Sequence, residues 1–221
     1  MAEAKEFVVI GLGTFGSALV QRLASNGCRV TGMDSRRECV EALKSTLYEA
    51  LIGDAAEKDA LKHLPVSDAN AVVICLGEDI TQSLLATLHV KELGAKRIIA
   101  KGVTEEHGKI LKRLGVDRVV FPEAEIAENL GNQLTWPNII EYLPIGPEYT
   151  FAEIAVPDSF SAQTLAQLDV RRKFNVWVIG VKDALTGNLE IFPGGDFQFG
   201  GDQMLLVVGK QADLTRLRDT H

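Results

Sequence analysis

The sequence predicts an α/β protein with a Rossmann-like, doubly wound parallel sheet, followed by a second, smaller α+β domain. Three observations support this fold class. A glycine-rich turn joins the first apolar run to a helix, short apolar runs alternate with helical patterns, and the pattern changes to mostly strands after about residue 135. Short strands that are apolar throughout and separated by helices are typical of a parallel sheet covered on both faces.

Six apolar runs of β-type composition are the expected strands of the first sheet, at residues 7–10, 29–33, 49–52, 71–76, 97–100 and 118–121. Helical patterns follow them near residues 17–25, 37–45, 57–63, 80–93, 105–114 and 123–134. Gly27, Gly94 and Gly115 stand where C-terminal caps of such helices belong. Six strands with their helices complete one doubly wound domain.

The domain boundary is expected after the last of these helices. Trp136-Pro137 breaks the helix and a cluster of Pro144, Gly146 and Pro147 follows. We therefore expect a first domain at 1–135, a linker at 136–148 and a second domain at 149–221. In the second domain we expect strands at 150–156, 176–182, 189–192 and 203–208, helices at 162–168 and 212–218, and a hairpin turn at 186–188.

Composition restricts the class of protein. Of the 221 residues, 46% are hydrophobic and 24% charged, which is ordinary for a soluble globular chain. A net charge of −7 argues against a nucleic-acid surface. No apolar run approaches the roughly 20 residues that cross a bilayer, and no signal peptide is visible, so we expect a cytoplasmic protein. Cys28, Cys39 and Cys75 lack Cys-x-x-Cys spacing, so we expect buried thiols rather than a disulfide, zinc ligands or a nucleophile.

The glycine turn is the strongest functional signal. Gly11, Gly13 and Gly16 have the Gly-x-Gly-x-x-Gly spacing of a dinucleotide-binding turn. The first glycine makes the turn, the second lets a pyrophosphate approach, and the third lets helix pack on strand. The helix start adds about half a positive charge for phosphates. Asp34, at the end of the second strand, is placed to accept hydrogen bonds from both ribose hydroxyls. The sequence therefore predicts a nucleotide site.

Residues after the other strands extend this site, because ligands sit outside the carboxyl ends of a doubly wound sheet. Asp54, with the backbone of Leu76 and Gly77, is placed to meet an adenine edge; alternatively, Asp54 caps the helix near residue 57. Lys101 either reaches a terminal phosphate or is an exposed surface lysine. His107 lies in a helix start, where an isolated histidine is more often a solvated residue.

Residues for catalysis are not apparent. The sequence shows no Ser/His/Asp order, no Tyr-x-x-x-Lys pair and no metal-ligand spacing among its four histidines. We therefore expect a nucleotide that is sensed rather than consumed, and no enzyme activity. Two alternatives remain open: a small NAD-dependent oxidoreductase, and a soluble NAD-responsive redox sensor.

The whole pattern resembles a known family. The glycine turn, Asp34, Gly53-Asp54-Ala55, the stretch from Gly115 to Glu123 and the small C-terminal domain together resemble the KtrA/TrkA family, the RCK-domain regulatory subunits of bacterial potassium uptake systems. The resemblance covers essentially the whole chain. It implies an RCK N-terminal nucleotide-binding domain with a crossover helix and an RCK C-terminal domain.

The resemblance also implies a mode of action. Members assemble as rings, commonly octamers, at the cytoplasmic face of a membrane-embedded potassium-translocating subunit of the KtrB/TrkH kind. ATP, ADP or NAD(H) binds the N-terminal lobes and changes the shape of the ring. This chain would then be a peripheral gating subunit of a potassium channel or transporter.

Site residues are implied by the same resemblance. It places Asp34, Ser35 and Arg36 around the ribose, Asp54 and Ala55 at the adenine, and Leu76, Gly77 and Glu78 along the neighbouring wall. It places Lys101, Gly102, Val103 and His107 near the phosphates. The glycine turn itself contributes Gly11, Gly13, Thr14, Phe15 and Gly16. Glu123 matches a carboxylate that helps to bind Mg or Ca between ATP-bound subunits. The basic stretch 169–174 matches a region that binds cyclic di-AMP in some relatives, although a solvated loop is an equal alternative.

Two further features qualify these expectations. Thr14 stands where KtrA-type members usually carry an arginine, and it brings no charge to a terminal phosphate, so NAD(H) remains a candidate beside ATP and ADP. Asp34 disfavours NADP because it would repel a 2′-phosphate. Ile126, Leu130 and Leu134 form one apolar stripe on the helix at 123–134. We expect that stripe to contact a neighbouring subunit, with the core of its own domain as the alternative.

Overall fold

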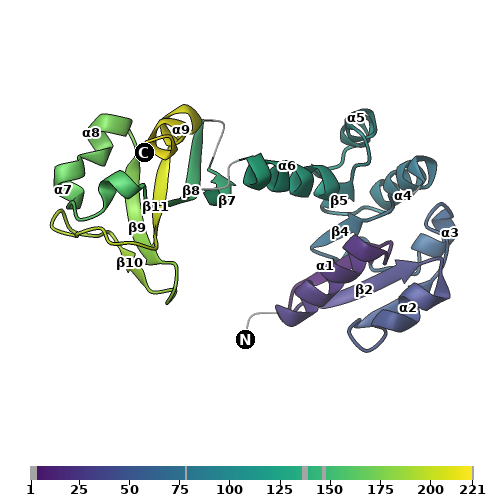
Figure 1. Cartoon of the computed structure of the whole chain (residues 1–221). Helices are drawn as coiled ribbons and strands as arrows, with labels where there is room; N and C mark the ends of the chain where they lie inside the picture. Colours follow the sequence, from purple (N-terminus) through teal and green to yellow (C-terminus); the bar gives the residue numbers. More distant parts are fainter. Residues whose placement is uncertain (1–3, 78, 136–138, 146–147, 221) are drawn as a thin grey trace. The chain divides into compact units, whose positions relative to one another are not determined.

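The computed structural model describes residues 4–77, 79–135, 139–145 and 148–220. It divides the chain into two compact units, Met1–Ala124 and Glu125–His221 (Figure 1). The division falls inside one helix, α6 (Pro122–Thr135), rather than after it. The domain limits expected from the sequence therefore stay a prediction.

The first unit contains a six-stranded, wholly parallel sheet with strand order β3-β2-β1-β4-β5-β6, which is the doubly wound order. Its strands are β1 (Glu6–Ile10), β2 (Arg29–Asp34), β3 (Glu49–Ile52), β4 (Ala71–Ile74), β5 (Ile98–Lys101) and β6 (Arg118–Val120). The helices between them are α1 (Thr14–Ser25), α2 (Arg37–Leu43), α3 (Lys58–Leu61), α4 (Ile80–Glu92) and α5 (Glu105–Arg113). The predicted fold class is confirmed.

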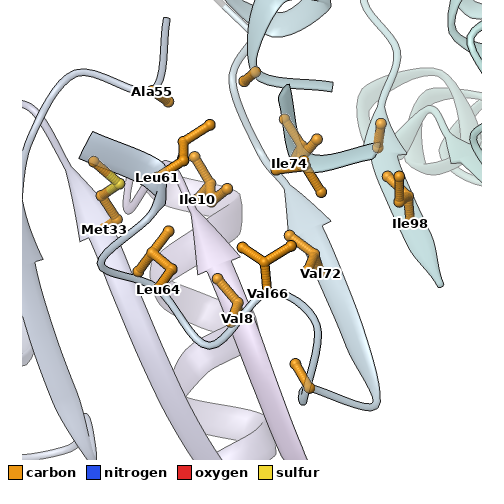
Figure 2. Close-up of a cluster of buried hydrophobic side chains, with 14 of the residues drawn as sticks. Val8, Ile10, Met33, Ala55, Leu61, Leu64, Val66, Val72, Ile74 and Ile98 are labelled. Carbon is orange, nitrogen blue, oxygen red and sulfur yellow. The ribbon is translucent and has the colours of Figure 1, made fainter. Parts of the chain in front are cut away.

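Side-chain alternation along the strands builds a core on each face of this sheet. Val8 and Ile10 of β1 pack in one cluster with residues of β2, β4 and the segment around α3 (Figure 2). Val9, between them, points to the other face and packs in a second cluster with Val20 of α1 and Val40 of α2. A strand buried on both faces must be apolar at every position, which is why these runs could be recognised in the sequence.

The second unit contains a five-stranded antiparallel sheet with strand order β10-β9-β11-β8-β7. Its strands are β7 (Ile139–Pro144), β8 (Tyr149–Ala155), β9 (Trp177–Asp183), β10 (Leu189–Ile191) and β11 (Gln203–Lys210). A 3-10 turn (Asp158–Phe160) and the helices α7 (Leu165–Leu168), α8 (Val170–Phe174) and α9 (Gln211–Arg218) accompany them. This arrangement is the small α+β unit that the sequence predicts.

Two segments differ from the sequence-based expectation. Residues 139–144, placed in a linker, form the edge strand β7, which pairs antiparallel with β8. Prolines and glycines in and around this segment suggested a linker, but an edge strand tolerates such residues. The basic stretch expected as a loop forms the short helix α8.

Among the described residues, no helix has both the length and the apolar character of a membrane span.

Candidate nucleotide-binding site

The glycine turn lies between β1 and α1 and has the geometry that the motif predicts. Gly11 has a φ of +90°, which glycine adopts without strain, and its amide donates to the Met33 carbonyl at 2.8 Å. A Cβ on Gly16 would overlap the carbonyl oxygen of Gly11. Helix α1 begins at Thr14, and no side chain caps its N-terminus at Gly13. The first amides of α1 therefore remain available to an anion.

Asp34 is fixed directly beside this turn. Only 6% of the residue is exposed, and its Oδ2 accepts from the Leu12 amide at 2.7 Å. Its Oδ1 accepts from the amide of Arg36 at 2.9 Å and from Arg36 Nε at 3.2 Å. Burial raises the pKa of this carboxyl, but hydrogen bonds from the Arg36 side chain, the Arg36 amide and the Leu12 amide outweigh burial and lower the pKa overall. An ionised acceptor thus stands at the end of β2, where a ribose is expected.

A cleft opens at the carboxyl ends of β1, β2 and β3. It is lined by Ile10, Gly11, Met33, Asp34, Ser35, Gly53, Ala55, Leu76 and Gln82. Five of these are predicted site residues from four separate segments of the chain. The structure therefore brings Gly11, Asp34, Ser35, Ala55 and Leu76 together around one cleft.

Asp54 is joined to this cleft by a residue that the sequence did not single out. Its Oδ1 accepts from the Ala56 amide and from Gln82 Nε2, each at 2.8 Å. The alternative of a helix cap is wrong, because α3 begins at Lys58 with no side-chain cap. Gln82 lies in the first turn of α4, and only its position just after β4 could have drawn attention to it.

A second group of predicted residues gathers at the end of β5. Lys101 Nζ donates to Glu123 Oε1, joining the end of β5 to the start of α6. The Lys101 side chain is only 16% exposed, so the alternative of an exposed surface lysine is wrong. A Cβ on Gly77 would lie 3.3 Å from Lys101 Nζ, so the lysine also borders the loop after β4. The hydrogen bond from Lys101 is the main cause that lowers the pKa of the Glu123 carboxyl.

His107 and the two glycines near it are packed rather than solvated. His107 is 1% exposed, and its Nδ1 accepts from the Val103 amide at 3.3 Å. Burial lowers its pKa, so the neutral imidazole is favoured. The alternative of a solvated helix histidine is therefore wrong. The Phe121 ring fills the space beside Gly102 and Gly108. A Cβ on Gly108 would lie 2.6 Å from Phe121 Cζ.

The remaining predicted residues border the two groups. Thr14 is exposed and Phe15 half-buried in the first turn of α1. A Cβ on Gly13 would lie 3.6 Å from Arg36 Nη2, so this arginine stands over the turn. Glu78 lies outside the described residues.

The cysteines carry no functional geometry. Cys28, Cys39 and Cys75 are free and only half-buried, whereas the sequence suggested buried thiols. Cys75 lies against the glycine turn, and desolvation raises the pKa of its thiol to about 12. The thiolate form needed for reactivity is therefore disfavoured at this position.

The donors around Glu123 allow a partial test of the predicted divalent site. An exposed carboxylate is a suitable ligand for Mg or Ca, which require six or more oxygen ligands. Within the described part of the chain, no group of three or more His, Cys, Asp or Glu side chains is arranged to hold a metal ion. One chain thus offers a suitable ligand but needs further oxygens from a phosphate or another subunit.

Comparison with known proteins gives a consistent result. Residues 7–122 match the family model described as the TrkA-N domain. The chain is 31% identical over 212 residues to the Ktr system potassium uptake protein C of Bacillus subtilis (strain 168), covering 96% of this chain and 95% of that protein. It is 28% identical over 215 residues to the Ktr system potassium uptake protein A of the same organism, covering 97% and 96%.

Solved structures show the same fold. A crystal structure of the GsuK RCK domain superposes with a TM-score of 0.66 at 19% identity, covering 98% of this chain and 47% of that one. A structure of the GsuK channel bound to NAD gives a TM-score of 0.64 at 18% identity, covering 98% of this chain and 39% of that one. The chain thus spans less than half the length of either structure.

Proposed function

We propose that this chain, which belongs to the TrkA-N domain family, is the nucleotide-sensing regulatory subunit of a Ktr-type potassium uptake system. The observation that carries the proposal is the ionised Asp34 held beside an uncapped glycine turn, in a chain that matches Ktr proteins over nearly its full length. The turn provides amides for a pyrophosphate and Asp34 provides acceptors for a ribose.

The ligand is proposed to be ATP, ADP or NAD(H). All contain an adenosine diphosphate part, which suits the turn amides, Asp34 and the cleft that Ala55 lines. NAD is supported by the fold neighbour whose structure contains it, the GsuK channel. Thr14 is compatible with any of these because it places no charge beside a terminal phosphate.

We propose that Lys101 links the ligand to the rest of the subunit. The Lys101 ammonium is paired with Glu123, the second residue of α6. A phosphate at the end of β5 would compete for the same ammonium and release the Glu123 carboxylate. The freed carboxylate could then contribute to a Mg or Ca site between ATP-bound subunits, together with phosphate oxygens.

Assembly is proposed to use helix α6. Ile126, Leu130 and Leu134 are all exposed, which favours a subunit contact over the alternative that they belong to the core of their own domain. An exposed apolar stripe of this kind suits a helix that packs against a neighbouring subunit. We propose a homo-oligomeric ring, octameric as in the KtrA family, on a membrane-embedded potassium-translocating subunit of the KtrB/TrkH kind. The ring would lie at the cytoplasmic face.

The second unit is proposed as a further control point. Arg171, Arg172 and Lys173 lie together on α8, and Arg171 stacks over the Trp177 ring at 5.2 Å. Cationic groups beside an exposed aromatic ring suit a ligand with phosphates and bases, such as cyclic di-AMP. Arg172 Nη1 lies 3.9 Å from Asp169 Oδ2, and this carboxylate weakens the attraction of Arg172 for phosphate.

The test is calorimetric titration of the nucleotide-stripped protein with ATP, ADP, NAD and NADH, with and without magnesium, beside its mass by light scattering. A sensor binds without turnover, discriminates between at least two of these ligands and forms a multi-subunit ring. Substrate-dependent oxidation of NADH would instead support an oxidoreductase. A monomer that binds only NAD(H) and never co-purifies with a membrane protein would support the redox sensor.

A further inference from the structure

The hydrogen bond between Asp54 and Gln82 fixes the orientation of an amide at the cleft. Gln82 Nε2 donates to Asp54 Oδ1 at 2.8 Å. A carboxylate only accepts hydrogen bonds, so it selects the nitrogen of the amide and excludes the opposite flip. The backbone of Gln82 is also held, because its amide donates at 3.2 Å to Asp79 Oδ1 at the N-cap of α4.

This orientation leaves an acceptor for a ligand. Gln82 lines the cleft with Ala55 and Leu76, and the amide atom that Asp54 does not engage is Oε1. Within the described residues, neither Gln82 Oε1 nor the Ala55 amide takes part in a hydrogen bond. Because Ala55 and Gln82 both line the cleft past β3, this wall would offer a ligand one acceptor and one donor.

The order of groups along the cleft places a base at this wall. The glycine turn follows β1, Asp34 ends β2, and Ala55 follows β3. With the pyrophosphate at the turn and the ribose at Asp34, the base lies next, beside Ala55 and Gln82.

Adenine and guanine present opposite groups to such a wall. Adenine carries an amino donor where guanine carries a carbonyl acceptor, and the neighbouring ring nitrogen is an acceptor in adenine and an N–H donor in guanine. Guanine would set oxygen against Gln82 Oε1 and N–H against the Ala55 amide. Unpaired polar groups of this kind lower the binding free energy when the site excludes water, so guanine would bind more weakly than adenine.

We propose that Gln82, held in one orientation by Asp54, selects adenine over guanine at this end of the cleft. The inference rests on the proposed nucleotide-sensing function. Gln82 is then a specificity-determining residue, and Asp54 acts through it as a positioning residue in addition to any direct contact with the base.

The test compares the affinities of the full-length, nucleotide-stripped protein for ADP and GDP by calorimetry, because ADP is the part common to ATP and NAD. We expect the wild type to prefer ADP. Gln82→Met keeps the length of the side chain without its polar atoms, and we expect it to reduce the ratio of the two affinities about tenfold. Gln21→Met, on the exposed surface of α1, is the matched control and leaves the ratio unchanged.

Asp54→Asn provides a second variant that does not remove the glutamine. An asparagine accepts or donates, so the Gln82 amide is free to flip and the preference for ADP falls even though Gln82 remains. An unchanged ratio in Gln82→Met, or equal binding of ADP and GDP by the wild type, overturns the inference while nucleotide sensing stands. Failure of the wild type to bind ADP at all overturns the proposed function and this inference together.

Discussion

The two units differ in which residues occupy left-handed backbone conformations. In the described part of the first unit, every residue with positive φ is a glycine: Gly11, Gly27, Gly94 and Gly115. In the described part of the second unit, five residues with positive φ carry side chains: Ala162, Asp169, Asn175, Phe192 and Asp202. Glycine adopts this region freely and Asn and Asp tolerate it, whereas other residues pay about 1–2 kcal/mol. The strain in the second unit is therefore concentrated at Ala162 and Phe192.

Measurements can separate the two units because of where the tryptophans lie. The chain has two, Trp136 and Trp177, and both follow the first unit in sequence. Trp177 lies in β9, so in a Trp136→Phe background its fluorescence follows the unfolding of the second unit, whereas far-ultraviolet circular dichroism follows both units. A change confined to the first unit should alter only the dichroism when the units unfold independently.

The largest expected effect comes from Gly16→Ala in the first unit. The new methyl group would overlap the Gly11 carbonyl oxygen, which is backbone and cannot move aside cheaply. We expect a loss of about 3 kcal/mol or more in the free energy of unfolding, with loss of nucleotide binding. Denaturant titration followed by circular dichroism measures it.

Gly131→Ala is the matched control for this substitution. Nothing lies within 4 Å of a Cβ at that helical position, so alanine should stabilise the protein by about 0.5–1 kcal/mol. Equal effects of the two substitutions would show that the turn is not tightly packed.

Asp34→Asn tests the electrostatic part of the same turn. An asparagine keeps one acceptor but turns its amide hydrogens toward the Leu12 or Arg36 donors, so we expect a loss of about 2 kcal/mol at neutral pH. The native pKa is lowered below the ordinary 3.8, so the stabilisation is fully present above that value and is lost as pH falls through the native pKa.

The pH dependence gives this prediction its control. Wild-type stability, followed by circular dichroism from pH 7 into the acid range, should decline more steeply below 3.8 than that of Asp34→Asn. Parallel curves for the two proteins would mean that Asp34 is not held ionised by its neighbours.

Asn175 allows strain and hydrogen bonding to be separated in the second unit. Its φ is 57°, and its Nδ2 donates to Asp213 Oδ2 at 2.9 Å. Asn175→Ala loses the bond and tolerates this conformation poorly, so we expect it to destabilise by about 2 kcal/mol. Asn175→Gly loses the same bond without the strain and should cost about 1 kcal/mol. Denaturant unfolding of the two variants compares them, and a cost of glycine equal to that of alanine would contradict a left-handed conformation at residue 175.

The smallest effect is expected at Ala162, which is exposed and has a φ of 63°. Glycine relieves the strain but loses more chain entropy on folding, so Ala162→Gly should stabilise by only about 0.5 kcal/mol. Ala212→Gly, at an exposed position of helix α9, should destabilise by about the same amount. A loss of stability in both variants would remove the contrast between the two units.

The same contrast explains what could be predicted from sequence. In the first unit, glycines mark the turns and uninterrupted apolar strands mark the sheet, so the fold, the glycine turn and Asp34 were all predictable. In the second unit, Asp169 and Asn175 adopt left-handed conformations at the two ends of α8 without a glycine to mark them, and the helix was missed.

Side-chain pairing was the part of the site that sequence could not supply. Gln82 meets Asp54 across 28 residues, and Lys101 meets Glu123 across 22. Neither pair follows from a local period, because each depends on how neighbouring strands end. The burial of His107 likewise depends on packing around α5 and not on its helix position.

The packing of Phe121 against Gly102 and Gly108 has a consequence for the history of this sequence. A Cβ on either glycine would meet the Phe121 ring, so the three positions share one fixed volume. Enlarging a glycine is tolerable only after the ring becomes smaller, and the smaller ring alone leaves a cavity that destabilises the protein. A step that enlarges one glycine, or that shortens Phe121 alone, is therefore expected to lower stability, so these three positions are expected to change together.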